Sequence, residues 1–131
     1  MNPSQYRAKG FQLSSLIEQS IIDKAESDII KAYINPINPN LQPTNETYLN
    51  ALMTLSFFLI CKRTNVFATR SGSKEKKNEF SDKVGNWDLV NDLVLDCHLA
   101  LEELKKTEGA NKNPKFIDIC NIYFKTTFYH I

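Results

Sequence analysis

The sequence has little of what builds disulfide-bonded, collagen-like or strongly charged proteins. Its 131 residues include three cysteines, four glycines and five prolines. Three cysteines exclude a disulfide framework and are typical of a reducing compartment. The low glycine and proline counts exclude collagen-like and linker-type composition. Sixteen basic and fifteen acidic residues leave a net charge of +1, so no overall field draws the chain to nucleic acid or to a membrane.

The chain also lacks the motifs of catalytic and metal-binding sites. Its two histidines, His98 and His130, have no partner at zinc-binding spacing. Ser71-Gly72-Ser73-Lys74 resembles a phosphate loop only superficially, because the earlier glycine and the GK[ST] ending are missing. Cys97 is expected in the core, and His98 is expected to be a structural histidine. The sequence therefore predicts no enzyme, no metal and no cofactor.

No export signal or membrane span is expected either. The N-terminus, Met1 to Gly10, is polar, and no apolar run follows its basic residues. The most apolar stretch, Tyr48 to Cys61, is shorter than the roughly 20 apolar residues that a bilayer span needs. We therefore expect a chain with a flexible segment 1–10 and no membrane partner.

What the sequence does contain is helical periodicity, with 42% hydrophobic residues. The first helix is predicted to begin at Ser15, where Ser15-Leu16-Ile17-Glu18 fits a capping box. Apolar residues then recur on one face, and Asn35-Pro36 is expected to end the helix. Residues 35–43, with three prolines, form the connector.

The second predicted helix is apolar on nearly every side. It opens with Thr44 as N-cap and runs to about Arg63. Such a helix must be buried all round, either within its own domain or by a neighbouring subunit. The sequence leaves both alternatives open.

A polar, basic segment follows at 64–85, as a protruding loop or a short hairpin. From Lys62 to Lys83 there are seven Lys and Arg residues and three Asp and Glu residues. Such a segment is either a solvated loop or a surface that meets phosphates or an acidic partner. The residues assigned to this partner or DNA-channel surface are Lys62, Arg63, Arg70, Lys74, Lys76 and Lys77.

The third helix is predicted from Trp87 to Thr107, with Asn86 as N-cap and Gly109 after it. One face carries a buried stripe, which includes Cys97. The opposite face is acidic, with Asp88, Asp92 and Asp96 assigned to a subunit interface. Like charges one turn apart destabilise a helix, so this ridge is expected to face basic neighbours in the same chain or across an interface.

The tail, residues 114–131, is rich in aromatic side chains and fits a helix or a strand. We favour a helix, and in either form the tail is expected to pack on the core. The fold class predicted from these patterns is all-α: one domain, 1–131, of three to four helices with the excursion at 64–85.

This order of elements resembles the head–tail connector (adaptor) proteins of tailed bacteriophages over roughly residues 11–107. The matching pieces are the helix Ile21 to Ile34, the apolar helix Leu52 to Arg63, and the polar Gly-containing loop Thr69 to Lys77 with the following Asn78-Glu79-Phe80-Ser81. The resemblance implies a small helical protein that forms a ring between portal and tail, with DNA passing through and no catalytic residues. The partners it implies are further copies of the chain, either in a preformed ring or in a ring that forms only on assembly, and the portal and tail proteins. The implied location is a virion or, before assembly, the bacterial host cytoplasm.

Any contact with DNA is expected to be weak and independent of sequence, because the basic residues lie in a loop rather than on a fixed element. The alternative function is a small helical regulatory or nucleic-acid-binding module, and an accessory subunit of an enzyme comes third.

Overall fold

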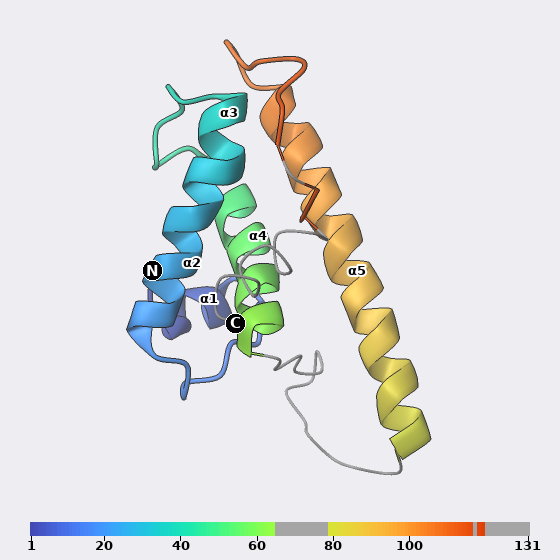
Figure 1. The fold of residues 1–131 in the computed structure, drawn as a ribbon. Helices are drawn as coiled ribbons and strands as arrows, with labels where there is room; N and C mark the ends of the chain where they lie inside the picture. Colours follow the sequence, from blue (N-terminus) through green and yellow to red (C-terminus); the bar gives the residue numbers. More distant parts are fainter. Residues whose placement is uncertain (65–78, 117, 120–131) are drawn as a thin grey trace, which may run out of the picture.

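Every regular element of the described chain is a helix, which confirms the predicted all-α fold (Figure 1). The computed structural model describes residues 1–64, 79–116 and 118–119, with the side chains of all of these except 79–90. The elements are α1 (Pro3–Ala8), α2 (Gln19–Ile29), a π-helical turn (Ile30–Ile34), α3 (Asn35–Ile37), α4 (Glu46–Thr64) and α5 (Glu79–Lys105). Because α2, the π turn and α3 follow one another without a break, they form one rod.

Helix α4 lies between this rod and α5 (Figure 1). It runs back along the rod after the turn at 38–45, and α5 runs back along α4, so that successive long helices are antiparallel. The short helix α1 lies near the other end of the rod from α3. At about 1.5 Å per residue, α4 is about 28 Å long and α5 about 40 Å.

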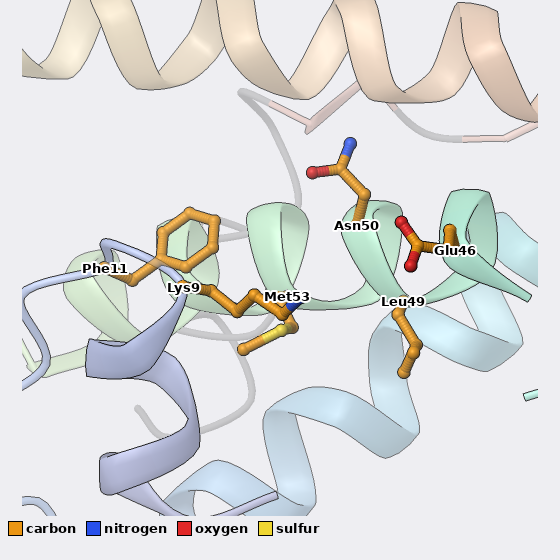
Figure 2. Close-up of a pocket in the computed structure, with 6 residues that line it drawn as sticks. All are labelled: Lys9, Phe11, Glu46, Leu49, Asn50 and Met53. Carbon is orange, nitrogen blue, oxygen red and sulfur yellow. The ribbon is translucent and has the colours of Figure 1, made fainter. Parts of the chain in front are cut away.

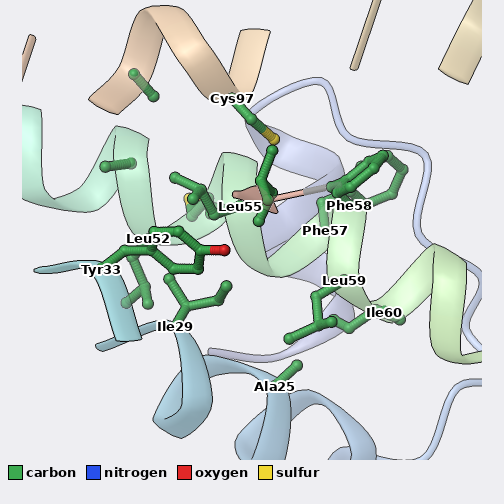
Figure 3. Close-up of a cluster of buried hydrophobic side chains, with 14 of the residues drawn as sticks. Ala25, Ile29, Tyr33, Leu52, Leu55, Phe57, Phe58, Leu59, Ile60 and Cys97 are labelled. Atoms are coloured by element: carbon green, nitrogen blue, oxygen red, sulfur yellow. The ribbon is translucent and has the colours of Figure 1, made fainter. Parts of the chain in front are cut away.

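The centre of the molecule is α4, and it is covered by its own chain. Every residue from 51 to 61 is buried, including the polar Thr54 and Ser56. Ile29 and Tyr33 approach α4 from the rod, and Cys97 approaches it from α5 (Figure 3). Of the two alternatives for this apolar helix, burial within its own fold is correct, so its composition gives no argument for oligomerisation.

The inner face of α5 contains the predicted stripe, except that Val94 is only half-buried and the side chain of Val90, also predicted there, lies outside the description. Leu93, Cys97, Leu101 and Leu104 are buried, together with Ala100. The thiol of Cys97 lies 3.8 Å from the carbonyl oxygen of Thr54 on α4. Cys97 is therefore a core residue, as predicted, whereas His98 is exposed on the next position round the helix.

The N-terminus differs from the flexible segment expected at 1–10. Asn2 caps α1 in a capping box with Gln5, and Tyr6 is fully buried. The Tyr6 hydroxyl donates to Glu26 Oε2 at 2.7 Å, and the Met1 ammonium lies 2.9 Å from Glu26 Oε1. Burial, and then the bond to Glu26, raise the pKa of Tyr6 well above its usual range. This pair of contacts to one buried carboxylate orders a segment that looks merely polar in sequence.

Both ends of the first long helix also differ from the prediction. Ser15 does not cap it; the Ser14 hydroxyl instead accepts from the Leu16 amide at 3.1 Å in a local turn, and α2 begins only at Gln19. Nor does Pro36 end the rod, which continues to Ile37. A proline ring clashes with the carbonyl four residues earlier, and the wider π turn directly before α3 makes room for it.

The other helix boundaries shift for identifiable reasons. Asn45, rather than Thr44, caps α4, because its side-chain oxygen accepts from the amides of Thr47 and Tyr48 at 2.8 and 3.2 Å. Helix α5 begins at Glu79, so it includes the end of the predicted loop and Asn86, the expected N-cap. It ends at Lys105, before Gly109, whose φ of 81° is left-handed. The rest of the predicted loop or hairpin, 65–78, lies outside the described residues.

The end of the rod is tied to the segment after α5. The buried Asn38 side chain donates to Thr107 Oγ1 and to the Glu108 carbonyl, both at 3.0 Å. The Asn111 amide donates to the Ile37 carbonyl at 2.7 Å. Of the aromatic tail, the Phe116 ring packs 5.2 Å from that of Tyr33 and Ile119 is buried; the predicted tail helix itself falls on residues outside the description.

The core position of Cys61 predicts an alkaline loss of stability. Burial raises the pKa of its thiol from the ordinary 9.0 to about 12, so the folded state keeps a proton that the unfolded state releases. The contribution of this thiol to the free energy of unfolding is therefore complete below its unfolded pKa and is lost as the pH rises through 9, by about 1 kcal/mol between pH 9 and 10 and by about 1.4 kcal/mol per pH unit above that. Urea unfolding of the wild type should show this loss between pH 9 and 10, and in Cys61→Ala the loss over the same range should be smaller by about 1 kcal/mol.

The matched control is Tyr6→Phe. It should leave most of the slope between pH 9 and 10 intact and reduce the slope mainly above pH 10, where an unfolded tyrosine is ionised and the buried Tyr6 is not. A Cys61→Ala protein that keeps the full slope below pH 10 would contradict this account.

Candidate interaction surface

The outer face of α5, opposite its buried stripe, is the most distinctive surface among the described residues. Leu95 and Leu99 lie there with 57% and 56% of their area exposed. They are one helical turn apart, so their side chains form a continuous strip along the helix. The third large exposed hydrophobic residue of the description, Leu16, stands apart in the turn before α2.

Carboxylates border this strip. Asp92 and Asp96, which the sequence assigns to a subunit interface, are both exposed. Glu102 and Glu103 follow on the next turn and contact Lys105 and Lys106 at 3.4 and 3.5 Å. Exposed pairs of this kind contribute little and exchange easily. The outer face of α5 is therefore acidic with an apolar centre.

Two residues of the predicted basic surface, Lys62 and Arg63, are described, and their side chains lie in different surroundings. Arg63 turns inward, with its guanidinium 2.6 Å from Asp28 Oδ2 and its side chain only 14% exposed. It ties the end of α4 to the rod rather than presenting a charge to a partner. Lys62 is half-buried and lies over the Phe58 ring, 5.3 Å from its centroid.

The remaining assigned residues are not placed. Arg70, Lys74, Lys76 and Lys77 lie outside the described residues, and so does the side chain of Asp88. The structure therefore brings Asp92 and Asp96 together on one face of α5. It separates Arg63 from the residues assigned to the partner or DNA-channel surface. The expected pairing of the acidic ridge with basic neighbours stays a prediction.

A small pocket lies beside the first turns of α4, between this helix and the segment that follows α1 (Figure 2). Its volume is about 170 Å³, and it is lined by Lys9, Phe11, Glu46, Leu49, Asn50 and Met53. Pockets that take small-molecule ligands are usually about 300–1,000 Å³. This one has the size of a recess for a single side chain.

The described residues hold no cluster of three or more histidine, cysteine, aspartate or glutamate side chains placed to bind a metal ion. Nor does any helix in the described ranges combine the length and the apolar character that crossing a membrane requires.

The sequence analysis missed two features of the surface. Leu95 and Leu99 have the composition of core residues. The one signal of their exposure is their position round the helix, opposite the stripe that contains Cys97. The inward turn of Arg63 could not be found at all, because its partner Asp28 is 35 residues away. Basic residues at the end of an apolar helix are instead typical of an exposed surface.

The two cations at Asp28 make a direct test of this interpretation. Arg63 and Lys24 both contact its carboxylate, at 2.6 and 3.2 Å, but the Lys24 side chain is 71% exposed. Arg63→Met should lower the free energy of unfolding by about 2 kcal/mol, because a charged hydrogen bond is lost in a partly buried site. Lys24→Met, the matched control, should lower it by only about 0.3–0.5 kcal/mol. If urea unfolding shows equal losses of free energy for the two variants, Arg63 belongs to the predicted partner or DNA-channel surface after all.

Comparison with known proteins gives no match: no family model, curated protein or solved structure is similar to this chain. The resemblance to head–tail adaptors thus remains one of layout.

Proposed function

We propose that the chain is a structural subunit that acts by binding other proteins, and specifically a ring-forming adaptor at the head–tail joint of a phage or prophage. The observation that carries this proposal is the outer face of α5, where Leu95 and Leu99 lie exposed between carboxylates. An apolar centre with a polar border is the composition of a protein–protein contact. The ring and its place in the virion come from the resemblance in layout.

A ring adaptor makes two kinds of contact, with copies of itself and with the proteins above and below it. Contacts between copies in a ring are head-to-tail, so each subunit must offer two different surfaces. The acidic face of α5 can serve as one of these surfaces. Over residues 91–105, where the side chains of α5 are described, the side that faces α4 is buried and the outer face is open to a partner.

The acidic face also bears on the alternative function. Carboxylates along α5 repel phosphate, and Arg63 is held by Asp28. In the proposed adaptor, Lys62, Arg70, Lys74, Lys76 and Lys77 make only weak contacts with DNA, which any sequence would satisfy and which salt would weaken. No observation among the described residues favours a sequence-specific binder.

The oligomeric state tests the proposal. At micromolar concentration and low salt, mass photometry of the purified chain should show a closed species of several 15.0 kDa copies, and electron microscopy should show rings. Raising the salt should shift the population toward the monomer, since charged contacts are screened. A chain that forms only a two-fold dimer under these conditions contradicts the ring, whereas a monomer fits only a ring that closes on its partners during assembly.

A further inference from the structure

Leu16 lies at the tip of a tight turn that precedes α2. Its side chain is 89% exposed, more than that of any other large hydrophobic residue in the description. The Ile17 amide donates to the Ser14 carbonyl at 3.2 Å, and the Leu16 amide donates to the Ser14 hydroxyl at 3.1 Å. Because these bonds fix the turn 14–17, Leu16 is held outward at its tip. A leucine fixed in this way is available to a partner at little conformational cost.

The pocket beside the first turns of α4 has the size and the lining that a leucine side chain needs (Figure 2). Its apolar part consists of Met53, which is buried, and of Phe11 and Leu49, which are half-buried. Its volume is about 170 Å³, and a cavity engineered by truncating one leucine of a protein core has about 150 Å³. Leu16 of the same chain does not enter the pocket, since its side chain is exposed.

The charges beside the Leu16 turn and beside the pocket are complementary. Glu18 follows Leu16 by two residues, and Lys9 lines the pocket. Both side chains are exposed, and neither makes an ion pair with another described residue. Glu46, which has the same charge as Glu18, lies at the other end of the pocket from Phe11 (Figure 2). A glutamate that arrives with Leu16 is therefore expected at the end near Phe11 and Lys9.

We infer that the pocket binds Leu16 of a second copy of this chain, with Glu18 of that copy beside Lys9. This inference rests on the proposed function, in which copies of the chain contact one another, and it names one contact between them. A second copy is the occupant because the chain itself carries an exposed leucine of matching size and neighbouring charge. The turn and the pocket are different patches, so a copy that gives Leu16 to one neighbour can receive Leu16 from another.

Disulfide trapping tests this contact even where it is short-lived. Cys120 is replaced by serine in every chain, and Cys61 and Cys97 are buried. A Leu16→Cys chain is mixed with an Asn50→Cys chain under mild oxidation. The 16–50 disulfide should form at least about tenfold faster than the disulfide in a control mixture of Leu16→Cys and Lys31→Cys, because docking raises the effective concentration of the two thiols. Lys31 is as exposed as Asn50 in class but does not line the pocket.

Further variants test the chemistry of the contact. Self-association is measured by analytical ultracentrifugation and, if the chain is monomeric, by the rate of trapping. Leu16→Ser should weaken it about tenfold or more, and Glu18→Lys about threefold. Lys9→Glu combined with Glu18→Lys should restore it, since the charges are exchanged across the contact. Ser15→Ala, the control on the same turn, should leave it unchanged, and circular dichroism verifies that each variant is folded.

Three results would overturn the inference. The 16–50 disulfide forms no faster than the control, Leu16→Ser associates as tightly as the wild type, or the exchanged charges fail to restore association. Rings that persist in Leu16→Ser refute this inference and leave the proposed function standing. A two-fold dimer trapped through the 16–50 disulfide supports the inference and contradicts the ring.

Discussion

The structure depends on one constraint: α4 is apolar on every side and must be covered on every side. Residues 51–61 are all buried, and no single helix can do this. The rod of α2 and α3 covers one side and α5 another, and Phe11, after α1, adds an aromatic contact 5.2 Å from Phe57. The polar ties at the periphery hold these covering elements in place; they do not form the core.

These polar contacts join the elements that cover α4 to other parts of the chain. Glu26 holds the N-terminal segment through Tyr6 and the Met1 ammonium. Asp28 holds the end of α4 through Arg63, and Asn38 holds the segment after α5. Each joins parts of the chain that are far apart in sequence. Each also uses a polar group whose burial would be unfavourable if it were unpaired.

Local patterns in the sequence were sufficient for the fold class, the central helix and the buried stripe of α5. They could not yield α1, because its order depends on Glu26, which is 20 residues from Tyr6. Nor could they yield the start of α5, since Gly85 and Asn86 locally suggest a break that the long helix tolerates at a cost of about 1 kcal/mol for the glycine. The acidic ridge was predictable from periodicity, whereas the exposure of Leu95 and Leu99 depends on which side of α5 packs against α4.

This distinction between the two sides of α5 underlies the functional account. The inner side holds the fold together, and the proposed function assigns contacts with other proteins to the outer side. If the outer leucines were instead needed for folding, the strip would be only a poorly covered part of the core. The proposed partner would then have no surface of its own.

The most direct measurement compares the equilibrium unfolding of Leu99→Ala and Leu101→Ala, two leucines on opposite sides of the same turn that are 56% and 4% exposed. The account predicts a loss of about 2–4 kcal/mol for Leu101→Ala, since a core side chain is removed. It predicts a change within about 0.5 kcal/mol for Leu99→Ala, as at other surface sites. A loss for Leu99→Ala as large as that for Leu101→Ala would show that the outer face belongs to the core and would contradict the account.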